Sequence, residues 1–425
     1  MPRKLPITRN KTGPWPALMI FLLLPALQTA AGPAEERKEG LSLDQAVASA
    51  LAHHPDVLAA QAEIAAASAR RLQAEARPDP TLALGTAGIP FNLKGEEGKE
   101  TEVEMGLSQT FEFPGKRKLR VEVGRYAEDI AALELERVRM ILAARIRKAY
   151  FRVVRSDQAL ERIASASGLL DRLVEAIQVQ YAAGRAAYAD VLRARLDKTR
   201  LQNQALEERR ERLAAAAELN LLLGRPAGET LRLVSGMNAP PLGRSVEEMK
   251  AAALAARPSI RIAALRAEQA AAAERLTGLN RNPDLTAGLY VPSKRFSAWG
   301  FSFSLTLPLS GKRWQGERAE AAAAREASLA AVDGLRRRVA VMIESAYESV
   351  RLAEEQVRIL ELQLLAELDN ELKVSLDLYA LGKIQAYALI DLYRTAAEAG
   401  LEHLRAVFNG AIARVDLDIA GEDIS

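Results

Sequence analysis

The stretch WGFSFSLTLPLSGKR, residues 299–313, alternates bulky and small side chains for eleven residues and then ends in a basic turn. Nearly two hundred residues earlier, VEMGLSQTFEFPGKR, residues 103–117, has the same alternation and the same final GKR. A period of two predicts a β-strand with one bulky face, whereas most of the remaining sequence reads as helical. The bulky faces consist of Val103, Met105, Leu107, Gln109, Phe111 and Phe113, and of Trp299, Phe301, Phe303, Leu305, Leu307 and Leu309.

The two strands belong to a longer internal duplication. The segments that begin at Leu51 and Leu254 align without a gap, so that two prolines in each segment match at a spacing of 203 residues. Further on, the glycines of the GKR turns match at a spacing of 196, and those of YAAGRAAYADVL and YALGKIQAYALI at 198. The matched pairs are Pro55 and Pro258, Pro80 and Pro283, Gly115 and Gly311, and Gly184 and Gly382. Matched landmarks in the same order predict two copies of one unit.

The duplication divides the chain into a leader and two repeats. The leader covers residues 1–31, and the junction of the repeats lies near residues 236–245. Each repeat is expected to contain two short helices, a β-hairpin, a very long helix, a glycine break and another long helix. The first repeat, 32–243, has strands near 81–90 and 103–113 and a helix tip near 180–190; the second, 244–425, has strands near 285–291 and 299–309 and a tip near 378–392.

Two segments, residues 116–180 and 312–378, contain no proline and almost no glycine. A continuous helix of that length would extend about 100 Å and would need coiled-coil packing. A seven-residue apolar repeat supports this prediction in the second segment, at Ile343, Val350, Val357 and Leu364. Taken alone, these helices would fit a plain antiparallel coiled coil, but the duplicated strands do not.

Strands of about 9–11 residues with an unbroken bulky face are typical of tilted transmembrane β-strands, although a half-buried strand packed on a helix is the ordinary alternative. Four strands cannot close a barrel, and an open edge in lipid leaves backbone groups unsatisfied. Several chains must therefore share one barrel. Three chains would supply twelve strands, enough to enclose water.

The N-terminus is expected to be a cleaved signal peptide. Four basic residues precede the apolar run ALMIFLLLPALQTAA, which is shorter than the roughly 20 residues needed to span a membrane. The net charge of +3 depends on this segment, because the chain after residue 31 has 54 basic and 55 acidic residues. That balance argues against a nucleic-acid partner. The chain has no cysteine, which excludes disulfides, thiolate metal sites and a lipidated N-terminal cysteine.

In this combination the sequence resembles the TolC-like outer-membrane efflux proteins. The resemblance rests on LSLDQAVASALAHHPDVLAAQAE, on the paired FPGKRKLR and LSGKRWQGE, and on YAAGRAAYADVLRARLD with YALGKIQAYALIDLYRTAAE. It covers essentially the whole chain after the leader and is strongest for the heavy-metal and cation efflux branch, the CzcC/CusC-like proteins. It implies a homotrimer in which a twelve-stranded β-barrel in the outer-membrane lipid continues as a long α-helical barrel in the periplasm. The partners would be a periplasmic adaptor and an inner-membrane pump of the resistance-nodulation-division type, and the channel would conduct substrate passively.

The resemblance also implies functional positions. Asp190, Tyr379, Asp391 and Lys383 would form the periplasmic constriction, and Gly184 and Gly382 would mark the tips that dock the adaptor. Three copies of Asp391 on one axis would favour cations. Two positions depart from the family pattern, because Ala388 replaces a second ring aspartate and Ile384 replaces an arginine. The strand-to-helix turns are Gly115, Lys116 and Arg117, and Gly311, Lys312 and Arg313.

Other functions have less support. The chain has three histidines and no Gly-x-Ser-x-Gly, phosphate-loop or zinc-spacing motif, so neither an enzyme, a cofactor nor a resident metal is expected. His53 and His54 are adjacent and would point about 100° apart on a helix. A soluble periplasmic coiled-coil adaptor or adhesin would share the leader and the helices but would not need the duplicated strands. A nonspecific porin would have no use for the long helices.

Overall fold

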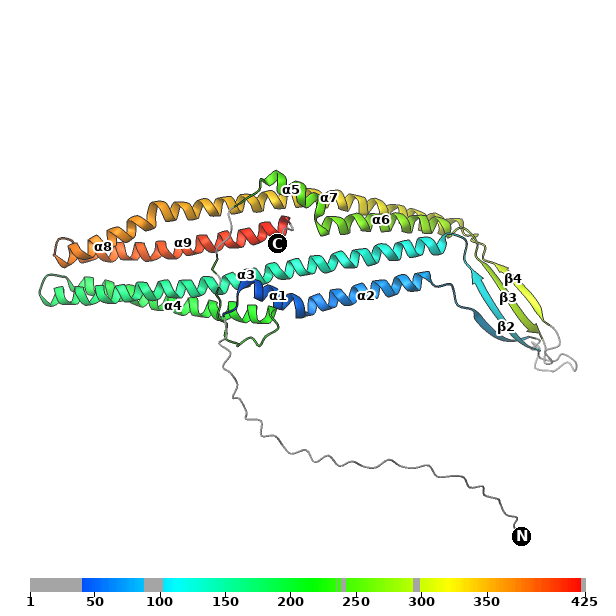
Figure 1. Ribbon diagram of the computed structural model, residues 1–425, viewed down its shortest axis with the longest axis horizontal. Helices are drawn as coiled ribbons and strands as arrows, with labels where there is room; N and C mark the ends of the chain where they lie inside the picture. The colour runs from blue at the N-terminus through cyan, green and yellow to red at the C-terminus, as the bar shows by residue number, and fades with distance from the viewer. Residues whose placement is uncertain (1–39, 88–101, 235, 238–241, 293–298, 422–425) are drawn as a thin grey trace, which may run out of the picture. The chain divides into compact units, whose positions relative to one another are not determined.

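A computed structural model describes residues 40–87, 102–234, 236–237, 242–292 and 299–421 of the chain. The expected signal peptide, both hairpin loops and part of the predicted junction lie outside these residues. The described part is mainly helical, as predicted (Figure 1). Its elements are α1 (Leu43–His53), α2 (Pro55–Glu75), β1 (Thr81–Ala87), β2 (Glu102–Phe111), α3 (Lys116–Ala182), α4 (Tyr188–Leu222), α5 (Val246–Ala256), α6 (Pro258–Leu279), β3 (Leu285–Pro292), β4 (Gly300–Leu305), α7 (Gly311–Ile359), the π-helical turn η1 (Leu360–Leu365), α8 (Ala366–Ala380) and α9 (Ala386–Gly421).

The short helices that open each repeat begin with the same local chemistry. Ser42 and Ser245 each form a reciprocal capping box with the side chain three residues later. Pro55 and Pro258 then occupy the first turn of α2 and α6, where the missing N–H has no intrahelical acceptor to lose. The two aligned segments therefore begin with the same helix caps and the same first-turn proline.

The long helix of the first repeat is continuous, but that of the second is not. Helix α3 has 67 residues, or about 100 Å of axis. In the second repeat α7 stops at Ile359, and η1 separates it from α8, so the expectation of one unbroken helix over 312–378 is wrong. A π-helical turn holds an extra residue and rotates the chain that follows it.

The extra residue moves the apolar seam by one position. Before η1, Ile343 and Val350 are buried as the seven-residue repeat predicts, and Leu360, the first residue of η1, is buried as well. Beyond it Ser375 is buried, whereas Val374, two seven-residue steps after the buried Leu360, is exposed. The seam thus continues in α8 one residue later than the sequence repeat predicts.

The helices pack in an order that follows the strands. Near the sheet the neighbours are α2, α3, α6 and α7 in that sequence, which is also the order β1–β2–β3–β4. Toward the glycine breaks, α3 packs on α4 and on α9, and α8 packs on α9. The largest apolar core joins α1, α3, α4 and α9 around the fully buried Tyr150, whose hydroxyl donates to the carbonyl of Leu41 at 3.0 Å.

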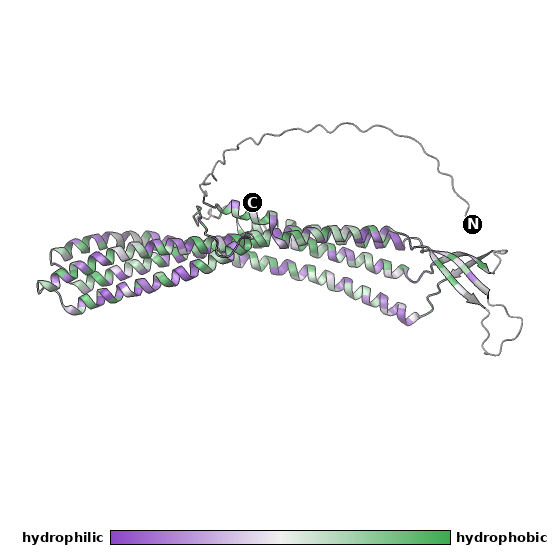
Figure 2. Cartoon of the chain, turned by 90° about the horizontal axis from the view of Figure 1, so that it is seen from below, coloured by the Kyte–Doolittle hydropathy of each residue, from purple (hydrophilic) through white to green (hydrophobic). Residues whose placement is uncertain are grey.

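The four-stranded sheet is antiparallel throughout, and its register gathers the bulky side chains on one face. Leu84 lies opposite Met105, Leu107 opposite Leu289, and Leu289 opposite Phe301. The opposite face carries small residues, among them Gly106, Gly288, Ser108 and Ser302. Figure 2 shows apolar colour on the strands, where no helix covers it. The fold leaves large apolar side chains exposed along all four strands, namely Leu82, Leu84, Met105, Leu107, Phe111, Leu285, Leu289, Phe301, Phe303 and Leu305.

The last strand is shorter than the alternation predicts. β4 ends at Leu305, so Leu307 and Leu309 keep the bulky alternation but lie outside the ladder, and both are exposed. Pro308 has no N–H to donate to a ladder at this point.

None of the helices in the described ranges is both long enough and apolar enough to cross a membrane.

Candidate functional site

The two helix tips are built alike around a left-handed glycine. Gly184 has φ +69° and Gly382 has φ +67°. In the first tip the N–H of Gly184 donates to Tyr181 O and that of Arg185 to Gln180 O, at 2.9 and 2.8 Å. Gly382 and Lys383 make the equivalent bonds in the second tip, both at 2.9 Å. This is the Schellman arrangement, in which glycine satisfies the last carbonyls of a helix without a Cβ penalty.

The fold brings the predicted gate residues Tyr379 and Asp190 together from different repeats. Tyr379 at the end of α8 is 7% exposed and packs in one apolar cluster with Val191 of α4. Burial raises the pKa of Tyr379, and the carboxylate of Asp190 raises it further. The phenol oxygen is buried and has no hydrogen-bond partner among the described residues. Tyr379 therefore lies inside the helix packing, close to the Asp190 carboxylate but not bonded to it.

Asp190 lies in the first turn of α4, where the helix dipole favours a negative charge. Its side chain is largely covered, and Arg193 one turn later is its ion-pair partner at 3.5 Å. The first turn of α4 thus holds a largely covered carboxylate near the buried phenol of Tyr379.

The other two predicted gate residues are exposed. The Asp391 carboxylate in α9 accepts from Arg394 at 2.5 Å, so its charge is partly offset within its own helix. Lys383 follows the glycine of the second tip, and no ion pair of its side chain occurs within the described ranges. At the two positions that depart from the family pattern, Ile384 joins the apolar cluster and Ala388 is exposed.

A buried phenol that the sequence did not single out lies deeper in the same cluster. Tyr393 in α9 donates a hydrogen bond to the backbone carbonyl of Ala166 in α3. Burial, together with Asp171 and Asp197, raises its pKa well above the usual range. The only hint in the sequence is its apolar helical spacing from Leu389 and Ile390. The bond from Tyr393 to Ala166 therefore links α9 of the second repeat to α3 of the first, close to the tips.

The strand-to-helix turn of the first repeat is tied to the second repeat. Gly115 has φ +100° and precedes α3. The Lys116 side chain is buried, and its Nζ donates to Asn282 O at 2.9 Å and to Asp284 Oδ1 at 2.8 Å. The N–H of Phe113 donates to the same carboxylate oxygen at 2.7 Å. Burial alone would raise the pKa of Asp284, but these bonds and the Lys116 charge lower it.

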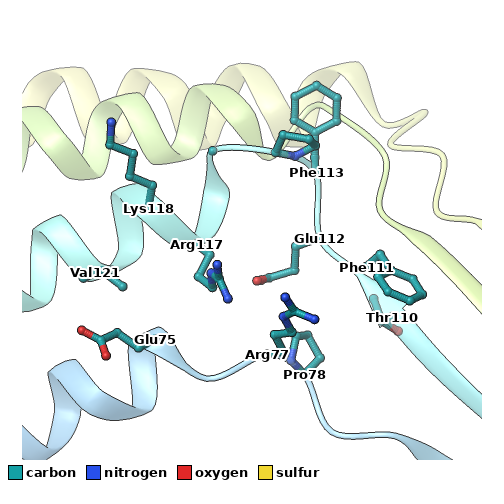
Figure 3. Close-up of a pocket in the computed structure, with 12 residues that line it drawn as sticks. Glu75, Arg77, Pro78, Thr110, Phe111, Glu112, Phe113, Arg117, Lys118 and Val121 are labelled. Carbon is teal, nitrogen blue, oxygen red and sulfur yellow. The ribbon is translucent and has the colours of Figure 1, made fainter.

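A charged depression of about 650 Å³ adjoins this turn. Glu112, Arg117 and Arg77 converge in it (Figure 3). Arg120 holds Glu112 in place with two bonds of 2.5 and 2.9 Å, and also donates to Ala74 O at 3.2 Å. These contacts fix α2, β2 and α3 relative to one another where strand becomes helix.

The matching turn of the second repeat has a different structure. Gly311 is the first residue of α7 and does not adopt a positive φ. Lys312 is exposed, and Arg313 pairs with Glu317 one turn along, at 2.8 Å. The Trp314 ring lies under the guanidinium groups of Arg281 and Arg318, at 5.0 and 5.6 Å from their carbons to its centroid. Identical GKR sequences thus form a buried junction in one repeat and an open one in the other.

No group of three or more metal-binding side chains occurs among the described residues.

Comparison with known proteins agrees with this architecture. Residues 46–225 match the family model described as outer membrane efflux protein. No curated protein matches the chain. Among solved structures, CusC has 19% identity and a TM-score of 0.77 over 89% of this chain and 91% of its own. VceC of Vibrio cholerae has 18% identity and a TM-score of 0.75 over 89% and 95%.

A third structure, the open state of the MtrE outer membrane channel of Neisseria gonorrhoeae, has 18% identity and a TM-score of 0.76 over 89% of this chain and 88% of its own. The family model covers most of the first repeat, and the structural matches extend the likeness across both. The resemblance of this chain to the TolC-like outer membrane efflux proteins is thereby confirmed, in sequence over residues 46–225 and in fold over most of its length.

Proposed function

We propose that the protein is the outer-membrane duct of a tripartite efflux system and conducts substrate passively from the periplasmic side to the exterior. The observation that carries this proposal is the sheet, whose bulky apolar face is exposed along all four strands. Phe303, for example, is 73% exposed. The opposite face is mostly small, with Gly, Ala, Ser and Thr beside Glu104 and Tyr290. An apolar face of this extent needs lipid or a partner to cover it.

The open edges of the sheet support an assembly of several chains. β1 and β4 each pair on one side only. Unpaired backbone groups in hydrocarbon cost several kcal/mol each, so a sheet in lipid must close on itself. Three copies would give a twelve-stranded barrel, and the small residues would face its interior. Helices α2 and α7 lie at the corresponding edges of the helical layer, so the same three copies would close a helical barrel below it.

At the far end the tips would form the regulated entrance. In this proposal the Asp190 carboxylate accepts a hydrogen bond from Tyr379 in the closed state, and three Asp391 carboxylates around the axis attract cations. Lys383 would lie at the same level. The pairing of Asp391 with Arg394 weakens each carboxylate's field, so opening is expected to involve this pair.

The partners follow from the same proposal. The exposed tips at Gly184 and Gly382 are alanine-rich and would let the hairpins of a periplasmic adaptor approach closely, and an inner-membrane pump would select the substrate. Export by a signal peptide over residues 1–31 would deliver the chain to the outer membrane. Heavy-metal cations are the proposed substrates, on the resemblance of the sequence to the CzcC/CusC-like branch.

The decisive experiment is the mass of the detergent-extracted protein by light scattering, corrected for bound detergent. A mass near three processed chains, together with ion conductance in a planar bilayer, is the expected result. A monomer that stays soluble without detergent would refute the duct and favour a soluble coiled-coil adaptor.

A further inference from the structure

The junction between β2 and β3 shows how a strand-to-helix turn of this protein is completed. Within one chain, the first repeat offers Lys116 and the second repeat offers the segment Asn282–Asp284 just before its hairpin. The lysine is buried there, and the segment gives it a backbone carbonyl and a carboxylate. This contact joins the turn of the first repeat to the start of the hairpin of the second.

Each half of this contact has a counterpart in the other repeat, and the two counterparts lie at the two free edges of the sheet. The spacing of 196 takes Lys116 to Lys312, which follows β4. The spacing of 203 takes Asn282–Asp284 to Asp79–Thr81, which leads into β1. Lys312 and Asp79 are both exposed, and no ion pair of either occurs among the described residues. Since β1 and β4 are opposite edges of the sheet, the two halves cannot form this contact within one chain.

The turn at Gly311 lacks two features that accompany the Lys116 contact in the turn at Gly115. In the first repeat Gln109, Thr110 and Phe111 extend β2 by pairing with β3 alone, beyond the last residue paired with β1. Their counterparts are Leu305, Thr306 and Leu307, and β4 ends at the first of them. Gly311 likewise lacks the positive φ of Gly115. Both differences occur where a neighbouring β1 would lie.

We propose that Lys312 of one copy docks on the Asp79–Thr81 segment of a second copy of this chain. Its Nζ takes the backbone carbonyl of Asp79 in place of that of Asn282, and the Thr81 hydroxyl in place of the Asp284 carboxylate. The Asp79 side chain, which carries a charge where Asn282 has none, lies beside the ammonium group and offsets it. The inference rests on the proposed shared barrel and adds the residues that hold its seam.

The same two spacings also assign the register between β4 of one copy and β1 of the second copy, the strands that would meet in the shared barrel. Repeating the β2–β3 register with these spacings places Leu305 opposite Leu84, Leu307 opposite Leu82 and Thr306 opposite Ala83 of the second copy. Leu82 and Leu84 already belong to the bulky face, as do Leu305 and Leu307. The register therefore keeps one face apolar across the seam, which a slip of one residue would not.

The register can be tested directly, because the chain has no cysteine of its own. Thr306→Cys combined with Ala83→Cys puts two thiols on the small face at a spacing that a disulfide can bridge. Oxidation should give covalently linked species of two and of three chains. Thr306→Cys with Gly85→Cys is the matched control, since a two-residue offset separates the thiols by about 7–8 Å between Cα atoms. More cross-linking of the control than of the matched pair would overturn the register.

The lysine is tested by comparing Lys312→Ala with Arg313→Ala. Both remove one exposed basic side chain, but Arg313 already has its partner Glu317 in the same chain. On dilution in detergent, Lys312→Ala should raise the monomer fraction about tenfold, the usual effect of losing a hydrogen bond to a charged group, and Arg313→Ala should leave it unchanged. Equal effects, or none, in a protein that is still trimeric would overturn the role of Lys312 and leave the duct intact. A wild-type chain that never associates would instead overturn the duct.

Discussion

Lys116 and Asp284, 168 residues apart in the chain, form a 2.8 Å ion pair where the first repeat's turn meets the start of the second repeat's hairpin. The lysine is buried and the carboxylate half-buried. No sequence motif around either residue predicts this pair, although it connects the end of the first hairpin to the start of the second. It also provides the clearest test of the fold.

Replacing Lys116 with Ala should destabilise the protein by about 2 kcal/mol. The substitution leaves the Asp284 carboxylate without its cation, and partial solvent access reduces the penalty below that of a fully buried pair. Chemical denaturation followed by circular dichroism measures the change. Lys312→Ala is the matched control on monomeric protein and should change the stability by less than about 0.5 kcal/mol. Similar losses for the two lysines would contradict the difference between the turns.

The same pair predicts a dependence on acid. The folded pKa of Asp284 is lower than its unfolded value, so the carboxylate stabilises the fold at any pH above the unfolded value near 3.8. That contribution should be lost as the pH falls from about 4 through the folded pKa. Denaturation midpoints at several pH values, compared between wild type and Asp284→Asn, would show it. The difference between the two proteins should shrink below pH 4; a constant difference would argue against the pair.

At the tips, Gly184→Ala and Gly382→Ala should each cost about 1 kcal/mol. No atom lies within 4 Å of the position that a Cβ would occupy, so the penalty comes only from the left-handed backbone. Gly168→Ala is the control, since Gly168 lies inside α3 with open space around it, and alanine should stabilise the helix there by about 0.5–1 kcal/mol. Thermal melts of the three variants test whether the two tip substitutions lower the melting temperature while Gly168→Ala raises it.

Removing the phenol oxygen of Tyr379 should have a different effect from removing that of Tyr393. Tyr379→Phe deletes a buried hydroxyl that has no partner, so folding stability should stay equal or rise slightly. Tyr393→Phe deletes the bond to Ala166 and should cost about 1 kcal/mol. If Tyr379 closes the entrance through Asp190, its variant should also raise the single-channel conductance. An unchanged conductance would remove Tyr379 from the gate.

Asp391→Asn should lower the preference of the channel for cations over anions, because it removes three carboxylates from the proposed ring. Reversal potentials in a planar bilayer under a salt gradient measure this preference. Asp333→Asn is a suitable control, because Asp333 is also exposed and paired with an arginine three residues later, but lies in α7 away from the tips. Equal shifts for both variants would mean that net charge alone, and no ring, accounts for the effect.

The sequence allows part of this architecture to be predicted, and the physical reason differs by feature. The faces of β2 and β4 follow from alternation, because successive side chains of a strand point to opposite sides. Left-handed caps at Gly184 and Gly382 follow from glycine at the end of a long helix. These features depend only on neighbours in the chain.

Other features depend on contacts between residues far apart in the chain, and the sequence alone does not predict them. Lys116 is buried and Lys312 exposed within the same three letters, because only the first has a partner segment in its own chain. β4 ends at Leu305, earlier than its alternation predicts, and it lies at an open edge of the sheet. The burial of Tyr379 depends on the packing of α8 against the first repeat, and its proposed role in the gate, like those of Asp190, Asp391 and Lys383, remains a prediction.

The π-helical turn η1 lies in the stretch where the two repeats differ in length. Between the turn glycine and the tip glycine, the second repeat is two residues longer than the first, because the matched spacing is 196 at Gly311 and 198 at Gly382. A gain inside a plain α-helix would rotate everything after it and would disrupt the packing of the tip. The π-helical turn Leu360–Leu365 takes up one of these two residues, and the second tip still has the left-handed glycine cap that Gly184 forms in the first. After duplication, the tip could therefore be conserved while the length of the shaft was free to drift.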